Sequence, residues 1–155
     1  MAFPHGDGDK DMFDVEGKDF YKNVSTDAKK NIQAILTNKT LSKQEIEDKI
    51  DEYFNNDASA ADKAVYEKMK PLIAAKEAAI IKAIDDAVNN SSLTPAQKAL
   101  YASFRAVYTN KELTFQETRD QLKTLATAAD QKVAGDSKAV EKFIMQIIKA
   151  QVKSS

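Results

Sequence analysis

The stretch NKTLSKQE at residues 38–45 recurs 72 residues further along the chain as NKELTFQE at residues 110–117. In both copies a Ser or Thr stands three residues before a Glu, which is the capping box that starts an α-helix. A Leu directly before the capping residue can pack back onto the new helix as a hydrophobic staple. The repeated stretch therefore predicts two helix–loop–helix units, at about residues 25–54 and 94–130.

The residues around the two copies are those of a helical protein. Gly and Pro number only 4 and 3 in 155 residues, and three of the glycines lie before residue 18. Apolar residues recur at helical spacing, no long stretch alternates apolar with polar, and good helix formers such as Ala and Lys are abundant. We therefore predict an all-α fold class with six to seven helices.

A long central helix, from about residue 59 to residue 88, is expected to join the two units, because apolar residues keep helical spacing over this range. Pro71 lies inside it, and an internal proline removes a backbone hydrogen bond and clashes with the preceding turn. We therefore expect a kink or a break near residues 67–70. Residues 1–11 are predicted to form a flexible acidic arm, and residues 12–153 a single helical domain that contains the repeat.

The composition excludes several classes of function. The 23 Lys and Arg residues nearly balance the 24 Asp and Glu residues, so the chain lacks the basic character of a nucleic-acid binder. Cys is absent, and the one His is His5 in the predicted arm. Because no motif joins a nucleophile to a base, we expect a protein that is not an enzyme. No apolar run is long enough to span a membrane.

Without Cys and with a single His, any metal site must use oxygen ligands, which suit Mg²⁺ or Ca²⁺. Neither repeated loop has the Gly and Glu that an EF-hand calcium loop requires. A Mg²⁺ site needs fewer protein ligands, since the ion keeps several water ligands and uses one or two carboxylates. Glu45, Asp48 and Glu52 follow one another at i, i+3 and i+7 and so share one helix face. They are the candidate metal ligands of a weak Mg²⁺ site, and the alternative is an acidic face that only contacts water.

A second kind of binding site is apolar. Large side chains on the predicted helices could open a groove or pocket for a fatty acid, another lipid or a partner helix. The alternative is that the same side chains form the core of the protein. The residues concerned are Phe54, Tyr101, Phe104, Tyr108 and Phe115.

Residues 27–129 resemble the nematode SXP/RAL family of secreted antigens and allergens. The resemblance is carried by the order and spacing of several short stretches, namely NKTLS at 38–42, IEDKIDEY at 46–53, YEKMK at 66–70, AKEA at 75–78 and LTPAQKA at 93–99. It implies an all-α, calmodulin-like arrangement of helices, divalent-cation binding, and secretion after cleavage of a signal peptide. It also implies that host antibody recognises the protein. We expect a monomer.

Two further observations concern the location of the protein. The first eight residues lack the basic and apolar regions of a signal peptide, so the chain is either cytosolic or the mature form of a secreted protein. The sequence also has four Asn-x-Ser/Thr sequons, where about one is expected for its composition. The sequons begin at Asn23, Asn38, Asn89 and Asn90. Helix ends and loops, which are rich in Asn, Ser and Thr, are the alternative explanation of this excess.

Overall fold

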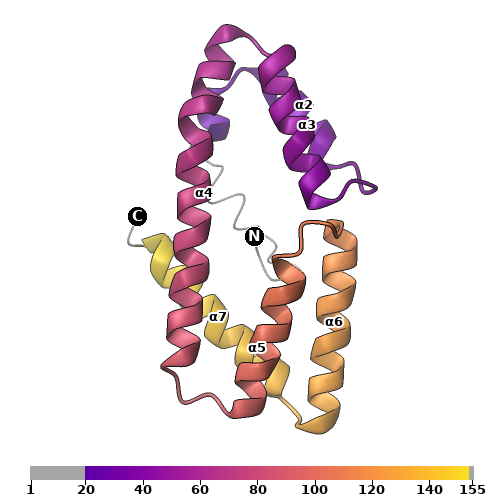
Figure 1. Ribbon diagram of the computed structural model, residues 1–155, viewed down its shortest axis with the longest axis vertical. Helices are drawn as coiled ribbons and strands as arrows, with labels where there is room; N and C mark the ends of the chain where they lie inside the picture. The colour runs from indigo at the N-terminus through magenta and orange to yellow at the C-terminus, as the bar shows by residue number, and fades with distance from the viewer. Residues whose placement is uncertain (1–19, 154–155) are drawn as a thin grey trace. The chain divides into compact units, whose positions relative to one another are not determined.

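The computed structural model describes residues 20–153, and every regular element among them is an α-helix (Figure 1). Residues 20–23 are helical, and six complete helices follow them. The all-α prediction is confirmed. The predicted acidic arm, residues 1–11, and His5 within it lie outside the described residues. The helices are α2 (Thr26–Leu36), α3 (Lys43–Asn56), α4 (Ala60–Asn89), α5 (Pro95–Tyr108), α6 (Phe115–Lys132) and α7 (Asp136–Lys153).

Three helices, α2, α3 and α5, begin at a Ser or Thr cap. Ser42 and Thr94 each form a complete capping box, in which the cap side chain accepts from the third residue's N–H and that residue's side chain accepts from the cap N–H. Ser25 caps α2 by accepting from the N–H of Ala28 at 3.2 Å. These contacts satisfy backbone N–H groups that a helix leaves without an internal partner, and so they set the helix boundaries.

The long helix α4 is not broken at Pro71, and this part of the prediction is wrong. The helix runs without interruption from Ala60 to Asn89 with the proline inside it. Pro71 lacks the N–H that would bond the carbonyl of Glu67, and both residues are exposed, so water can solvate that carbonyl. Several helical turns on either side of the proline then keep the helix continuous.

The chain divides into two compact units. Among the described residues, the first unit comprises 20–77 and 111–116, and the second comprises 78–110 and 117–153. The single domain expected from the sequence stays a prediction.

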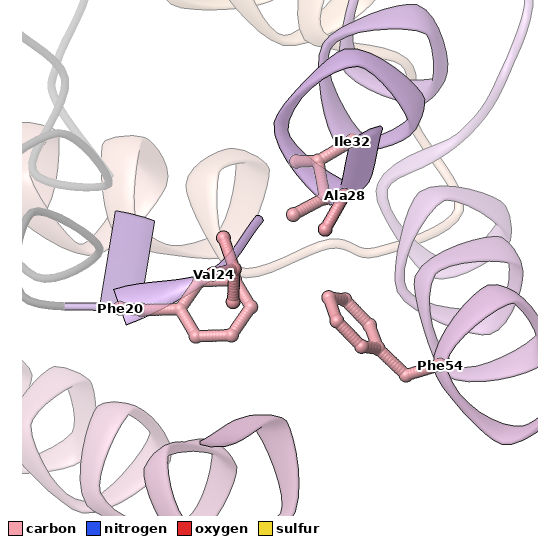
Figure 2. Close-up of a cluster of buried hydrophobic side chains, with 5 residues drawn as sticks. All are labelled: Phe20, Val24, Ala28, Ile32 and Phe54. Carbon is pink, nitrogen blue, oxygen red and sulfur yellow. The ribbon is translucent and has the colours of Figure 1, made fainter. Parts of the chain in front are cut away.

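An aromatic cluster forms the centre of the first unit. Figure 2 shows Phe54 of α3 pointing toward Ala28 and Ile32 of α2, with Phe20 and Val24 beside them. The ring of Phe54 also stacks on the ring of Tyr66 of α4, with centroids 4.3 Å apart. Phe54 is completely buried. It therefore joins three helices through one side chain.

A buried carboxylate joins the start of α2 to the first turn of α4. Oδ1 of Asp62 accepts from the N–H of Ser25 at 2.8 Å, and Oδ2 accepts from its hydroxyl at 2.5 Å. These hydrogen bonds lower the pKa of Asp62 below its ordinary value, although desolvation opposes them. The charged form of Asp62 is therefore part of the folded first unit.

The second unit has its own core and a similar carboxylate. α5 packs against α7, and Phe104, Val140 and Ile144 are almost completely buried. Asp130 accepts from the N–H of Ser137 at 2.9 Å and from its hydroxyl at 2.6 Å. Gly135 connects α6 to α7 with φ of +87°, a backbone conformation that glycine adopts without steric strain.

We predict that Phe54→Ala destabilises the protein by about 3–5 kcal/mol, because it removes a buried ring and leaves a cavity. Leu72→Ala is the control, since Leu72 is 56% exposed, and its effect should stay within about 0.5 kcal/mol. Urea unfolding followed by circular dichroism measures both. Equal effects of the two substitutions would contradict the assignment of Phe54 to the core.

We also predict that acid destabilises the protein partly through Asp62. A carboxyl group whose pKa is lowered by folding contributes stability above its unfolded pKa, and the contribution disappears as the pH falls through the folded pKa. Unfolding midpoints should therefore fall as the pH is lowered through 3.8, the ordinary pKa of Asp62, and below it. Asp62→Asn should be less stable at neutral pH and should show a smaller loss on acidification. A variant with the full acid dependence of the wild type would contradict this role.

Candidate functional site

The two copies of the repeated stretch pair with each other in the structure. Ser42 and Thr114, which occupy the same position in the two copies, form an antiparallel β-bridge. The N–H of Lys43 donates to the carbonyl of Leu113 at 3.1 Å, and the N–H of Gln44 donates to the carbonyl of Lys111 at 3.0 Å. All of these residues belong to the first unit. The two copies of the repeated stretch therefore lie side by side.

This pairing completes the hydrogen bonding at the start of α3. The first four N–H groups of a helix have no partner within the helix. At α3 the N–H groups of Lys43 and Gln44 donate to the partner loop, and those of Ser42 and Glu45 donate to the side chains of Glu45 and Ser42, at 2.7 and 3.1 Å. Since all four donors are used, the start of α3 is not available to bind an anion through its backbone.

An ion pair lies beside the paired backbones. Nζ of Lys111 lies 2.9 and 3.0 Å from the two carboxylate oxygens of Glu47. Both side chains are about half exposed, and so the pair contributes at most about 1 kcal/mol. Sequence reasoning attributed no contact to Glu47 or Lys111. The signal available was their place on the two copies of the repeat, but the direction of pairing is not visible in the sequence.

The candidate metal ligands lie on one exposed face of α3. The carboxylate of Glu45 accepts from the N–H of Ser42 at 2.7 Å as part of the capping box. Oδ1 of Asp48 accepts from the side-chain amide of Gln44 at 3.0 Å, while Glu52 is exposed. Within residues 20–153, no three His, Cys, Asp or Glu side chains are grouped closely enough to hold a metal ion.

Helix geometry explains why these three carboxylates do not form a cage. Residues at i and i+4 are separated by about 6 Å along the axis, whereas those at i and i+7 are separated by about 10.5 Å. Asp48 and Glu52 can therefore face one ion, and Glu45 cannot join them directly. This donor set does not fit the six to eight oxygen ligands of Ca²⁺, but it fits Mg²⁺ with most of its waters retained.

Other acidic residues already have partners. Asp51 of α3 accepts hydrogen bonds from the hydroxyl of Tyr66 and, at 2.6 Å, from Nζ of Lys70, both on α4. Desolvation works to raise the pKa of Asp51, but these two donors outweigh it and the pKa is lowered. Burial, together with Asp51, raises the pKa of Tyr66. This cluster is neutralised by its own lysine and holds α3 against α4.

A similar cluster lies in the second unit. The hydroxyl of Tyr101 donates to Asp85, and Nε of Arg105 donates to both oxygens of the same carboxylate, at 2.9 and 3.2 Å. Burial raises the pKa of Tyr101, and the hydrogen bond to Asp85 adds to the effect. The phenol therefore stays protonated, and the carboxylate of Asp85 is bound by two side chains of α5.

A buried lysine stands at the first residue of α3. Burial lowers the pKa of Lys43 to about 8, and the negative charge of Glu77 opposes this change. Its side chain is buried, with 6% of the residue exposed. Lys43 thus lies next to the paired loops without contributing a ligand to the acidic face.

Four of the five aromatic residues proposed for an apolar groove lie in the core. Phe54, Tyr101, Phe104 and Tyr108 are buried, whereas Phe115 is 39% exposed. A depression of about 510 Å³ does lie along α2, beside Tyr21, but it is open and carries Lys29 and Lys30 in its lining. Because it is open, this depression would not bury most of a lipid's surface, as a ligand pocket does.

Comparison with known proteins identifies the family. The model of the metal-binding domain of SXP/RAL-2 family proteins like Ani s 5 matches residues 7–151. The chain belongs to the SXP/RAL-2 family. No curated protein and no solved structure matches it. The family-model match covers the whole of the described structure except its last two residues, and it attaches metal binding to this domain as a family property.

No helix among residues 20–153 has the length and apolar character needed to cross a membrane.

We predict that the amide hydrogens of Lys43 and Gln44 exchange slowly with solvent, because both donate to the partner loop. Thr26 and Asp27 occupy the same first two positions of α2 and are exposed, so their amides serve as the matched control and should exchange faster. Hydrogen exchange followed by amide NMR measures the four rates. Equally fast exchange at both helix starts would show that the loops do not pair in solution.

Proposed function

We propose that this SXP/RAL-2 family member is a secreted, non-enzymatic protein that binds a divalent cation weakly, with Mg²⁺ as the preferred ion. The observation that carries the proposal is the match of the family's metal-binding domain over residues 7–151. The chain has no Cys and one His, so oxygen is the ligand that it offers in quantity. Oxygen ligands favour Mg²⁺ over zinc.

The face of α3 is where we place the ion. Asp48 and Glu52 would contact it or its water shell, and the charge of Glu45 would add attraction at longer range. Several other carboxylates are less suitable, because Asp51, Asp62, Asp85 and Asp130 each accept hydrogen bonds from two donor groups, whereas Asp48 accepts one, from Gln44. The bound ion would reduce the repulsion among the three acidic side chains of α3. Because few protein ligands are involved, we expect a dissociation constant of about 10⁻³ M.

Secretion and recognition by host antibody form the second part of the proposal. They are supported by the same family match, which concerns antigen-like proteins. In this view the exposed helices and loops are the surface that antibodies contact, and no catalytic group is required. The protein would act by binding.

The alternative function, a carrier of a fatty acid or another lipid, has less support. Four of the five aromatic side chains proposed for it are buried, and the depression along α2 is open and contains lysines. Mass spectrometry of the purified chain would detect lipid that remains bound. Co-purified lipid, with no response to Mg²⁺, would favour the carrier over the cation-binding protein.

Titration with Mg²⁺, followed by calorimetry and amide NMR, tests the site. We predict shifts at the amides around Asp48 and Glu52. Either Asp48→Asn or Glu52→Gln should weaken binding about tenfold, because each removes one charge beside a divalent ion. Glu45→Gln should weaken binding less, since Glu45 is a full turn further away, and it keeps the helix start because Gln97 fills the same capping role at α5.

The repeat supplies a matched control. Positions 117, 120 and 124 of α6 correspond to the three acidic positions of α3 but end in Thr124 instead of a third acid. Asp120→Asn should therefore leave the Mg²⁺ affinity unchanged. If Asp120→Asn weakens binding as much as Asp48→Asn, the ion is not held by α3. If no amide of α3 shifts at 10 times the expected dissociation constant, about 10⁻² M Mg²⁺, the site assignment fails.

A further inference from the structure

Four sequons occur in the chain, and the proposed cation site uses none of them. They begin at Asn23, Asn38, Asn89 and Asn90. A sequon accepts a glycan when its Asn side chain can be reached and when the folded protein has room for the sugar outside its core. The structure distinguishes the four by what their Asn, Ser and Thr side chains contact.

The sequon at Asn38 has its amide and its hydroxyl joined in a local turn. Oδ1 of Asn38 accepts from the N–H of Thr40 at 3.1 Å and from its hydroxyl at 2.7 Å. This is an Asx-turn, which involves residues two apart and needs no tertiary contact. It can therefore form in the chain before folding as well as afterwards.

Space for a glycan exists at the same place. Asn38, Lys39 and Thr40 are all exposed, in the loop between α2 and α3. Within the described residues no hydrogen bond uses Nδ2 of Asn38, so the nitrogen that would carry the sugar points to no protein partner. A sugar on Nδ2 would leave both hydrogen bonds to Oδ1 in place.

The other sequons contain residues that are buried or hydrogen-bonded to other parts of the protein. At Asn23 the middle residue, Val24, is buried, and the hydroxyl of Ser25 donates to Asp62 at 2.5 Å. At Asn89 the hydroxyl of Ser91 donates to the carbonyl of Val88 at 2.6 Å.

The fourth sequon overlaps the one at Asn89 and lies at the end of α4. The side-chain amide of Asn90 donates to the carbonyl of Asp86 at 2.9 Å. Glycosylation there would replace a hydrogen on a nitrogen that already closes the helix end.

We propose that Asn38 is a site of N-glycosylation. In this reaction Nδ2 of Asn38 attacks the anomeric carbon of an oligosaccharide carried on a lipid pyrophosphate. A carbon–nitrogen bond forms, the bond from that carbon to the phosphate oxygen breaks, and the lipid pyrophosphate leaves. The transferase that binds the sequon takes one proton from Nδ2. The proposal rests on the secretion part of the proposed function, because the donor is met in the secretory pathway.

The second copy of the repeat provides a matched pair of loops. Residues 110–112 read Asn-Lys-Glu, so Glu112 stands where Thr40 stands in the first copy, and no sequon exists. Thr40→Glu therefore removes the acceptor site and gives the first loop the residues of the second. Thr40→Ser keeps the sequon and its hydroxyl.

The test expresses the full chain behind an added secretion leader in eukaryotic cells. Trypsin cleaves after Lys30 and Lys39, so residues 31–39 form one peptide that contains Asn38. We expect wild type, Thr40→Ser and Asn23→Gln to carry a glycan on this peptide. It should be removable by peptide N-glycosidase, which leaves Asp at position 38. Asn38→Gln and Thr40→Glu should lose the glycan while keeping the wild-type circular dichroism spectrum.

Recovery of the peptide 31–39 from the secreted wild type without any sugar would overturn the proposal, as would occupation of Asn23, Asn89 or Asn90 instead. The added leader makes this result independent of Mg²⁺ binding and of the natural route of the protein. If the leader-bearing chain is glycosylated at Asn38 but the natural protein is found in the cytoplasm, the proposal of secretion is wrong. The assignment of Asn38 as an acceptor site is then still supported. The two failures are therefore distinguishable.

Discussion

Two backbone hydrogen bonds, from Lys43 to Leu113 and from Gln44 to Lys111, organise the first unit around its paired loops. They satisfy donors at a helix start that would otherwise need water, and they bring together two stretches that are alike in sequence. The side-chain contacts nearby follow from this register, including the ion pair between Glu47 and Lys111. The position of α3, and therefore of its acidic face, depends on the same pairing.

The acidic residues divide into those that hold the fold together and those that face water. Asp62 and Asp130 each bind both the N–H and the hydroxyl of a serine at the start of a helix. Asp51 and Asp85 each accept from a tyrosine and from a basic side chain. Because these donors already occupy the carboxylate oxygens, the four groups have less capacity for a free cation. For this reason we propose the cation site on the exposed face of α3 that carries Glu45, Asp48 and Glu52.

Local patterns predicted the helix starts well. Ser42 caps its helix as expected, and Ser25 and Thr94 make the same kind of contact, because a capping contact spans only three residues and can be recognised in the sequence. The same local reasoning predicted a kink or a break at Pro71, and the helix is not broken there. A single missing hydrogen bond on an exposed face is a smaller effect than the cooperative stability of the helix on either side.

The sequence by itself determined the all-α class, the helix starts and the presence of two related helix–loop–helix stretches, since these depend on residues a few positions apart. Only the tertiary structure decided that Phe54 stacks on Tyr66, that Asp62 binds Ser25, and that the two loops pair antiparallel. Each of these contacts joins residues on different helices or loops, and helical periodicity carries no information about which faces meet. The tertiary structure also decided which carboxylates are exposed on α3 and which serve as hydrogen-bond acceptors inside the fold.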